Sequence, residues 1–325
     1  MMYVSVVIPI FNERPNIRPL YLELKNTLSL AHVDCEILFV DDGSTDGTHR
    51  ELMSLIESDG AVRLISFRRN FGQTAAMQAG IEQANGDVIV TIDGDLQNDP
   101  RDIPVMLEKL AEGFDVVHGW RRQRHDAWLT RKLPSRIANW LIRHTTKFPV
   151  HDLGCTLKVM RTDIARELNL YGEMHRFIPI LAAQRGARCA EVITNHRPRR
   201  FGDSKYGLSR TVRVILDLMT VKYLQNYFAN PMKLFGVLGL GACAASACSL
   251  CATVAMKWFS SVDMTGNPLL LLSAFSVLAG IQLFGLGLLG EVLARIYYDA
   301  NERRPFAIAY DSATMTVRQP LKQVA

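Results

Sequence analysis

Two long uncharged stretches in the last third of the chain constrain its structure more than any other feature. No charged residue occurs from 234 to 256 or from 264 to 290. A helix over the first stretch would extend ~35 Å, which is enough to cross the ~30 Å hydrocarbon core of a bilayer. The sequence therefore predicts transmembrane helices at 233–257 and 264–292. The alternative is a buried helical hairpin of a soluble protein, in which uncharged runs of this length are rare.

The flanks of these stretches predict an orientation. Residues 266–268 (Gly-Asn-Pro) are a turn signal that joins the two helices into a hairpin. The only basic residue of the connection is Lys257, whereas the outer ends are basic and are therefore expected in the cytoplasm. The basic residues there are Arg210, Arg213, Lys222, Lys233, Arg295, Arg303 and Arg304. Mixed basic and apolar residues over 207–232 predict amphipathic juxtamembrane helices, with ordinary packing helices as the alternative, and 293–325 would form a cytoplasmic tail.

Composition excludes several classes of protein. Of the 325 residues, 48% are hydrophobic and 21% charged, which is too apolar for a disordered chain. The apolar residues concentrate in the last third, which argues against a transporter with many helices. The net charge of +5 comes without a clustered basic face or a base-reading motif, so no nucleic-acid partner is expected. Six scattered cysteines indicate a reducing compartment, and residues 1–15 lack the pattern of a cleavable signal peptide.

The first 120 residues alternate between two kinds of segment. Short apolar, β-rich runs predict strands at 3–10, 35–41, 62–66, 87–93 and 115–119. Helix-like segments between them lie at 16–30, 46–58, 72–84 and 102–112. This alternation predicts a mostly parallel sheet with helices on both faces. In such sheets, ligands bind beyond the carboxyl ends of the strands.

Polar clusters follow the first four predicted strands. They are residues 9–13, 41–46, 69–73 and 93–97. One acidic turn is a weak signal, because Asp and Gly are common in turns and caps. Four clusters at successive strand ends predict one crevice lined with carboxylates.

Within the last cluster, Asp93 and Asp95 are separated by one residue. Two carboxylates at a strand end can share a hard cation such as Mg²⁺, whose other positions are taken by water and substrate phosphate. Such an ion would assist a diphosphate leaving group. The alternative is that one aspartate caps a helix and the other belongs to a turn.

These motifs carry a family resemblance. Those shared most widely are Pro9/Asn12/Glu13, Asp41-Asp42-Gly43-Ser44 and Asp93-x-Asp95. The more specific ones are Phe71-Gly72-Gln73, Asp93-Gly94-Asp95-Leu96-Gln97-Asn98, Asp152-x-Gly154-Cys155, Arg176-Phe177-Ile178-Pro179, Phe201-Gly202-x-Ser204-Lys205-Tyr206 and Gly287-Leu288-Leu289-Gly290-Glu291. The chain resembles family-2 glycosyltransferases with the GT-A fold. Within them it resembles the polyprenyl-phosphate sugar transferases, a group that includes dolichyl-phosphate mannose synthase and bactoprenol glucosyltransferase. It looks most like the undecaprenyl-phosphate 4-deoxy-4-formamido-L-arabinose transferases.

The resemblance implies a Rossmann-like, nucleotide-sugar-binding GT-A domain over 1–206. It implies inverting transfer of one sugar from a nucleotide-sugar donor, expected to be UDP-linked, to undecaprenyl phosphate. A Mg²⁺ or Mn²⁺ cofactor would assist. The product would be a lipid-linked monosaccharide for cell-envelope glycan or lipid A modification, made at the cytoplasmic face of the bacterial inner membrane. The sugar and the oligomeric state, including a homo-oligomer, are left open.

The resemblance also implies roles for individual residues. Those matched to nucleotide-sugar binding are Pro9, Asn12, Glu13, Asp41, Asp42, Gln73, Asp93, Gly94, Arg199 and Lys205. Those matched to the metal are Asp93, Asp95 and Gln97, and those matched to catalysis are Asp93, Asp95 and Asp152. Those matched to the acceptor phosphate are Arg121, Arg131 and Ser135.

The expected chemistry favours arginines over a strong base. A phosphate monoester has a second pKa of ~6 and is already largely ionised at neutral pH, so it needs positioning more than deprotonation. The basic stretch suited to this comprises Arg121, Arg122, Arg124, Arg131, Lys132 and Arg136. Its alternative role is a solvated basic face near anionic lipid.

Three rival functions stay open at this point. One is a processive polysaccharide synthase, although the Gln-x-x-Arg-Trp element of those enzymes is missing from the sequence. Another is a membrane scaffold that binds a nucleotide sugar without catalysis. A third is a sugar nucleotidyltransferase, which would not need the hairpin.

Overall fold

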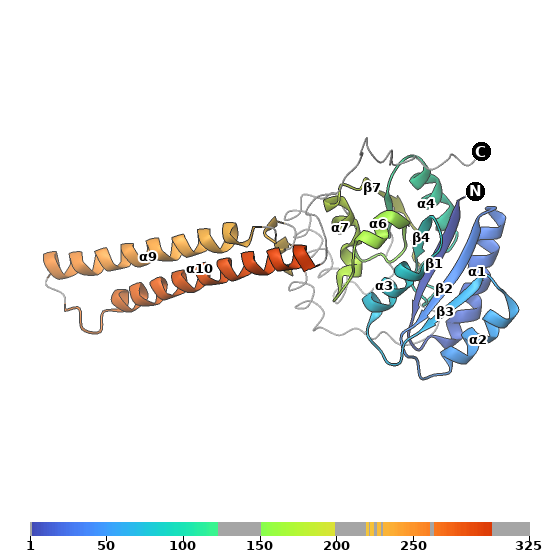
Figure 1. The fold of residues 1–325 in the computed structure, drawn as a ribbon, viewed down its shortest axis with the longest axis horizontal. Coiled ribbons are helices and arrows are strands. Elements are labelled where there is room, and N and C mark those ends of the chain that lie inside the picture. Colours follow the sequence, from blue (N-terminus) through green and yellow to red (C-terminus); the bar gives the residue numbers. More distant parts are fainter. Residues whose placement is uncertain are drawn as a thin grey trace. The chain divides into compact units, whose positions relative to one another are not determined.

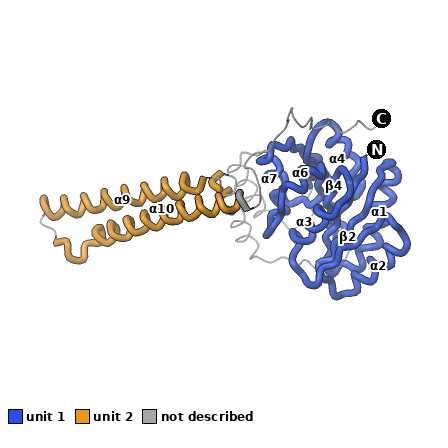
Figure 2. The backbone as a smooth tube through the Cα atoms, viewed as in Figure 1, with its two compact units in different colours: residues 1–218, 308–325 blue, residues 219–307 orange. Residues whose placement is uncertain are grey.

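The computed structural model describes residues 2–122, 151–198 and 219–300, apart from 221, 224–225, 229 and 261–262. The chain divides into two compact units, one of residues 1–218 with 308–325 and one of residues 219–307 (Figure 2). The first unit contains a seven-stranded sheet with helices on both faces, and the second contains two long helices (Figure 1).

The sheet has the strand order β3-β2-β1-β4-β6-β5-β7. Its strands are β1 (Tyr3–Ile10), β2 (Asp34–Asp41), β3 (Val62–Ser66), β4 (Val88–Thr91), β5 (Val116–Trp120), β6 (Lys158–Arg161) and β7 (Cys189–Ile193). Only β6 runs against its neighbours, β4 and β5, and all other pairs are parallel. The predicted mostly parallel α/β sheet is therefore confirmed.

Helices cover both faces of this sheet. They are α1 (Arg14–Leu30), α2 (Thr48–Ser58), α3 (Gln73–Gln83), α4 (Asp102–Ala111), α6 (Thr162–Glu167), α7 (Ile178–Gln184) and the 3₁₀ helix η2 (Met174–Phe177). Alternate residues of β1 form one core with α1, α2 and α4. On the other face, a Cβ at Gly80 of α3 would lie 2.3 Å from a methyl carbon of Val7, so only glycine lets α3 approach β1 this closely. Because both faces are covered, the central strands are almost continuously apolar.

The predicted elements of the first 120 residues are present, but some boundaries differ. The strand predicted at 87–93 ends at Thr91, because the chain then leaves the sheet and turns through Asp93. Neither β6 nor β7 was predicted, because both follow a long stretch of sequence without clear periodicity.

The second unit consists of α9 (Pro231–Ser260) and α10 (Pro268–Ala300). Both are long and apolar enough to cross a membrane. The helix predicted to start at 264 begins instead at Pro268, after a turn. There the side chain of Asn267 accepts a hydrogen bond from the Leu269 N–H at 3.0 Å, and proline suits the first helical turn.

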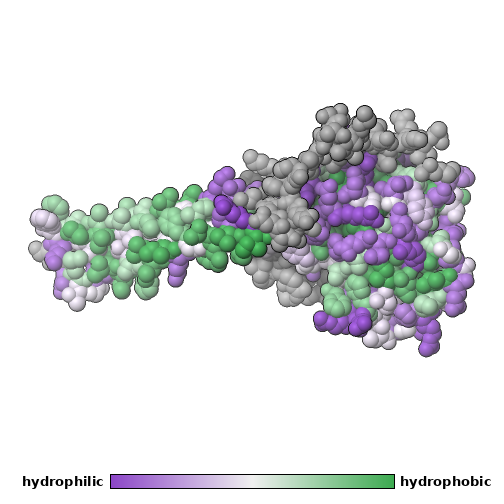
Figure 3. All heavy atoms as spheres, viewed as in Figure 1, coloured by the Kyte–Doolittle hydropathy of each residue, from purple (hydrophilic) through white to green (hydrophobic). Residues whose placement is uncertain are grey.

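Small and hydroxyl-bearing residues form the contact between α9 and α10. A Cβ at Gly280 would lie 3.1 Å from the Gly239 carbonyl oxygen, so the two backbones approach closely. The Ser246 hydroxyl donates to the Ser273 carbonyl at 2.8 Å. Only 22% and 11% of the most apolar windows of the two helices are buried, and the hairpin surface in Figure 3 is largely hydrophobic. The core helix of a soluble protein is mostly buried, so this low burial within the hairpin favours membrane-spanning helices over a buried hairpin.

Candidate active site

All the strands contribute to one edge of the sheet. The carboxyl ends of the parallel strands lie there, and β6, which runs the other way, brings its preceding residues to the same edge. The four polar clusters predicted from the sequence therefore converge with residues that precede β6. Side-chain hydrogen bonds connect these four clusters to one another.

The turn after β1 is joined to the turn after β2. The Asn12 N–H donates to the Ser44 hydroxyl at 2.9 Å, and the Asn12 side-chain oxygen accepts from the Thr45 N–H at 2.8 Å. Asn12 has a φ of 53°, a left-handed conformation that asparagine tolerates better than most residues. The buried carboxylate of Asp41 accepts from the Ser44 N–H at 3.0 Å. Glu13 follows Asn12, and its N–H donates to the Thr48 hydroxyl at 3.2 Å.

Asp42 connects the turn after β2 to the turn before α3. Its two carboxylate oxygens accept hydrogen bonds from the N–H groups of Phe71 (2.6 Å) and Gly72 (2.9 Å). Burial raises the pKa of Asp42, although these two hydrogen bonds act in the opposite direction. The neighbouring Gly43 has a φ of +72°, and a Cβ there would lie 2.5 Å from the carbonyl carbon of Arg69. Two turns thus meet backbone to backbone beside Asp42.

Asp93 lies at the centre of the edge. Its carboxylate accepts from the Gln73 amide at 2.7 Å and from the Thr156 hydroxyl at 2.6 Å. Burial and the nearby negative charge of Asp95 raise the pKa of Asp93 to about 6. Gly94 is packed so tightly that an added Cβ would lie 2.2 Å from a methyl carbon of Ile10. The structure thus brings Gln73, Asp93 and Asp95 together, and the buried Pro9 near the end of β1 lies next to Gly94.

The electrostatics of this pair fit a divalent cation. Two carboxylates in a poorly solvated place repel each other, and a cation relieves that repulsion. Within the described ranges, no three His, Cys, Asp or Glu side chains come together as a metal site. The predicted set instead has two carboxylates and the amide of Gln97, which suits Mg²⁺ if diphosphate and water supply the other ligands. The Gln97 N–H donates to Asp95 at 3.1 Å, and Leu96 between them has a left-handed φ of 61°.

Arg121 and Asp152 form a buried ion pair at the same edge. Nε of Arg121 donates to Oδ2 of Asp152 at 2.7 Å, and Nη2 donates to Oδ1 at 3.0 Å. Only 12% of the Arg121 side chain and 4% of the Asp152 side chain are exposed. The sequence resemblance matched these two residues to different roles, the acceptor phosphate and catalysis. In this structure each is the other's partner.

Glu191 of β7 holds the residue before Asp152. It accepts from the backbone N–H of His151 at 2.7 Å and lies 2.6 Å from Nδ1 of the same ring. It also lies 2.8 Å from Nε2 of the buried His118. Burial alone would raise the pKa of Glu191, but the hydrogen bonds from His118 and His151 outweigh it and lower that pKa to about 2. The His151 ring also stacks on Trp120, with ring centres 4.3 Å apart.

The sequence analysis missed three polar residues of this edge, namely Thr156, Lys158 and Glu191. Lys158 is 1% exposed on β6 and donates to the Cys155 carbonyl. Burial lowers the pKa of Lys158 to about 8, with the negative charge of Asp93 opposing the shift. Lys158 is the first of the four residues of β6, and its neighbours in the sequence give no local signal that it is buried.

Several predicted residues lie outside the described part of the chain. They are Arg131, Ser135, Arg199 and Lys205, together with Arg124, Lys132 and Arg136 of the basic stretch. Most of the predicted amphipathic segment, including residues 207–218, also lies outside it.

Comparison with known families agrees with this geometry. The family described as Glycosyl transferase family 2 matches residues 5–168, which is half of the chain and includes most of β1 and all of β2 to β6. The chain belongs to glycosyltransferase family 2. The strand-end clusters at Asp42 and Asp93 both lie in the matched part of this family-2 glycosyltransferase.

Two relatives of this glycosyltransferase extend the likeness across both units. Dodecaprenyl-phosphate galacturonate synthase of Rhizobium johnstonii is 42% identical, over 90% of this chain and 88% of the relative. Undecaprenyl-phosphate 4-deoxy-4-formamido-L-arabinose transferase of Pseudomonas aeruginosa (strain LESB58) is 36% identical, over 94% and 89% of the two chains. The predicted membership of the polyprenyl-phosphate group is therefore confirmed.

A solved structure supports the GT-A-like fold. Glucosyl-3-phosphoglycerate synthase from Mycobacterium tuberculosis, crystallised with Mn²⁺, UDP and phosphoglyceric acid, superposes with a TM-score of 0.53. The match has 21% sequence identity and covers 68% of this chain and 78% of that chain. The GT-A fold predicted for this glycosyltransferase is thus confirmed.

Proposed function

We propose that this protein transfers one sugar from a nucleotide-sugar donor to the phosphate of a membrane polyprenyl phosphate. The observation that carries the proposal is the Asp93/Asp95 carboxylate pair at the shared strand edge of a family-2 glycosyltransferase that also has two helices of membrane-spanning length. Both named relatives act on polyprenyl phosphates, according to their names. Undecaprenyl phosphate is our proposed acceptor.

The donor is proposed to be a UDP-sugar that binds at the carboxyl ends of β1, β2 and β4 and along the turns that follow them. The proposed donor-binding residues there, and at the start of α3 after β3, are Pro9, Asn12, Glu13, Asp41, Asp42, Gln73 and Gly94, with Arg199 and Lys205 expected to join them at the diphosphate. Asp42 fixes the 71–72 turn in this structure, so its role includes shaping the donor site. The glucosyl-3-phosphoglycerate synthase that shares the fold was crystallised with UDP.

A divalent cation, Mg²⁺ or Mn²⁺, would be held by Asp93, Asp95 and Gln97. When bound, it would neutralise the charge that develops on the diphosphate leaving group. Gln73 and Thr156 hold the Asp93 carboxylate in place from two sides. The protein therefore supplies a preorganised ligand set, which costs little reorganisation during the reaction.

The acceptor phosphate is the proposed nucleophile. One of its oxygens forms a bond to the anomeric carbon while the bond from that carbon to the diphosphate oxygen breaks, and the nucleoside diphosphate leaves with the electron pair. A single displacement of this kind inverts the anomeric centre. Arg131 and Ser135 are proposed to position the phosphate, together with any N–H groups of Arg121 that Asp152 does not engage. Asp152 is then an orienting carboxylate, held by Arg121, rather than a base.

The proposed location is the bacterial inner membrane, with the catalytic domain at 1–206 and the tail at 293–325 on the cytoplasmic side. Residues 207–232 would lie along the membrane surface, and the hairpin would cross it. A water-soluble donor and a lipid phosphate could then meet at the inner leaflet. The lipid product would serve cell-envelope glycan synthesis or lipid A modification.

The test is a product analysis. Purified protein is incubated with undecaprenyl phosphate, Mg²⁺ or Mn²⁺ and a panel of nucleotide sugars, and the lipid fraction is weighed by mass spectrometry. We expect one mass increase, equal to a single sugar residue, with one donor of the panel. A ladder of masses would indicate a processive synthase instead, and unchanged lipid with every donor would favour a non-catalytic scaffold.

A further inference from the structure

The segment that follows β7 lies across the loop that carries the proposed metal ligands. The Arg197 N–H donates to the Gln97 carbonyl at 2.9 Å. Asn98 and His196 form an antiparallel bridge. These contacts attach two consecutive residues of the 97–99 segment to residues about a hundred positions later in the chain.

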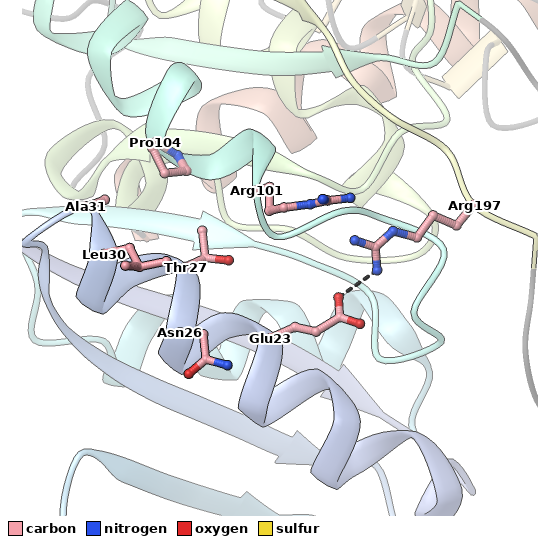
Figure 4. Close-up of a pocket in the computed structure, with 8 residues that line it drawn as sticks. All are labelled: Glu23, Asn26, Thr27, Leu30, Ala31, Arg101, Pro104 and Arg197. Carbon is pink, nitrogen blue, oxygen red and sulfur yellow. Dashed lines mark hydrogen bonds and ion pairs between the residues drawn. The ribbon is translucent and has the colours of Figure 1, made fainter.

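The guanidinium of Arg197 connects this loop to α1. Nη1 lies 2.6 Å from Oε2 of Glu23 (Figure 4). Nη2 lies 2.6 Å from Oδ1 of Asp99. Asp99 is 1% exposed, whereas Arg197 retains 20% exposure of its side chain. Arg101 also binds Asp99, at 2.7 Å, but its own side chain is 72% exposed. Arg197 alone among these residues contacts the buried carboxylate, the helix and the loop backbone.

A groove borders this connection. It has a volume of about 700 Å³ and is lined by one side of α1 and the start of α4 (Figure 4). Glu23, Arg101 and Arg197 all border the groove. Beside this groove, charge-assisted hydrogen bonds through Arg197 connect the buried Asp99 to Glu23 of α1.

The loop needs such support because part of it is strained. Leu96 is buried with a left-handed φ of 61°, which a branched apolar residue adopts only when its neighbours enforce it. Asp95 precedes Leu96 and Gln97 follows it, and the Gln97 N–H binds Asp95 at 3.1 Å. The attachments made by Arg197 begin at the residue directly after the strained one.

We propose that Arg197 is a positioning residue for the cation and diphosphate site, acting through Gln97 and Asp99. This inference rests on the proposed function, because it assumes that Asp95 and Gln97 hold a cation with the nucleoside diphosphate. Arg197 does not contact the reacting groups. It keeps the strained 95–97 turn in the conformation in which Asp95 and Gln97 can bind the same cation.

The test measures binding of UDP to the full-length protein in detergent by calorimetry, with Mn²⁺ and then with EDTA. Arg197→Met should raise the Kd for UDP with Mn²⁺ on the order of tenfold, the effect of losing one well-placed charged bridge. The Kd with EDTA should change little. Arg197→Lys, which can reach one carboxylate at a time, should show a smaller effect. The matched control is Arg101→Met, which removes the other cation on Asp99 but no link to α1, and it should stay close to wild type.

Three outcomes would overturn the inference. They are a wild-type Kd in a folded Arg197→Met protein, an equal loss with EDTA, and an equal loss in Arg101→Met. If Arg197→Met does not fold, Glu23→Gln removes one arm of the bridge from the opposite side. It should raise the same Kd by less, and no rise would count against the proposal. If the wild-type protein itself neither binds UDP with Mn²⁺ nor transfers a sugar, the proposed function fails, which is a separate result.

Discussion

Arg121 holds both oxygens of Asp152, with Nε donating to Oδ2 at 2.7 Å and Nη2 donating to Oδ1 at 3.0 Å. The pair joins the end of β5 to the segment before β6, across 31 positions of sequence. Burial by itself would lower the pKa of Arg121, but the negative charge of Asp152 and the hydrogen bonds to it outweigh burial and raise that pKa. Each side chain therefore supplies the opposite charge that offsets the burial of the other.

This dependence predicts coupling in a double-mutant cycle. Removing one partner leaves an uncompensated buried charge, so Arg121→Met and Asp152→Asn should each lower the free energy of unfolding by about 3 kcal/mol. The double variant should lose clearly less than the sum of the two. Chemical unfolding of the protein in detergent measures this. Additive losses would show that the two side chains act independently.

Asp95 is predicted to be essential for transfer and dispensable for folding. In Asp95→Asn the side-chain oxygen can still accept from the Gln97 N–H, so the turn should persist, while one cation ligand loses its charge. We expect turnover to fall at least about a hundredfold with an unchanged melting temperature. The control is Asp87→Asn at the opposite end of β4, which is exposed and should keep full activity. Near wild-type turnover in Asp95→Asn would remove the metal assignment.

Glu191 is predicted to make stability depend on pH. The pKa of Glu191 is lowered from 4.5 to about 2 in the folded protein, so its contribution is complete above pH 4.5 and is lost as the pH falls toward 2. After allowing for solvent screening at the half-exposed His151, the contribution is about 2 kcal/mol. Melting temperatures between pH 5 and 3 should fall less steeply in Glu191→Gln than in wild type. Glu112→Gln, which loses only a surface ion pair with Lys109, should follow the wild-type curve.

Gly43 should not tolerate a side chain. Its φ of +72° and the Arg69 carbonyl carbon 2.5 Å from an added Cβ leave no room beside Asp42. Gly43→Ala should therefore destabilise the protein by about 2 kcal/mol and weaken UDP binding, because the 69–72 turn must move. Gly60→Ala is the matched control, since nothing lies within 4 Å of a Cβ there. Calorimetry measures the Kd for UDP of both variants, and thermal melting measures their stability. Equal Kd values and equal melting temperatures would show that the two turns beside Asp42 can separate freely.

The close contact between α9 and α10 at Gly280 can also be tested by adding a side chain. A leucine at Gly280 would meet the Gly239 carbonyl and the Cys243 sulfur, whereas the Cβ position of Gly285 has no neighbour within 4 Å. Gly280→Leu should separate α9 from α10 and lower the melting temperature in detergent, and Gly285→Leu should not. If both variants melt like wild type, the two helices do not depend on this contact.

The sequence predicted the first part of the fold because its signals there are local. Apolar strands such as β1 and β2 end in polar turns, and each turn can be recognised within a few residues. In contrast, β6 has only four residues and carries lysine and arginine at its ends. Its place between β4 and β5 follows from antiparallel pairing with strands that precede it by about 40 residues or more. No local pattern encodes that pairing.

The candidate site shows the same limit. Asp93 and Asp95 could be predicted because two carboxylates one residue apart at a strand end suggest a cation. Thr156 could not, since it reaches Asp93 across 63 positions and is ordinary in its own surroundings. The pairing of Arg121 with Asp152 is a further example, because both residues were predicted for the site but the bond between them was not.

The most direct test of the central claim counts UDP released against sugar attached to lipid. Purified protein, undecaprenyl phosphate, Mn²⁺ and the accepted UDP-sugar should give one UDP for each lipid-linked sugar, and omitting either the lipid phosphate or the cation should stop both. UDP release that continues unchanged without lipid phosphate, or several sugars attached to each lipid, would contradict the account.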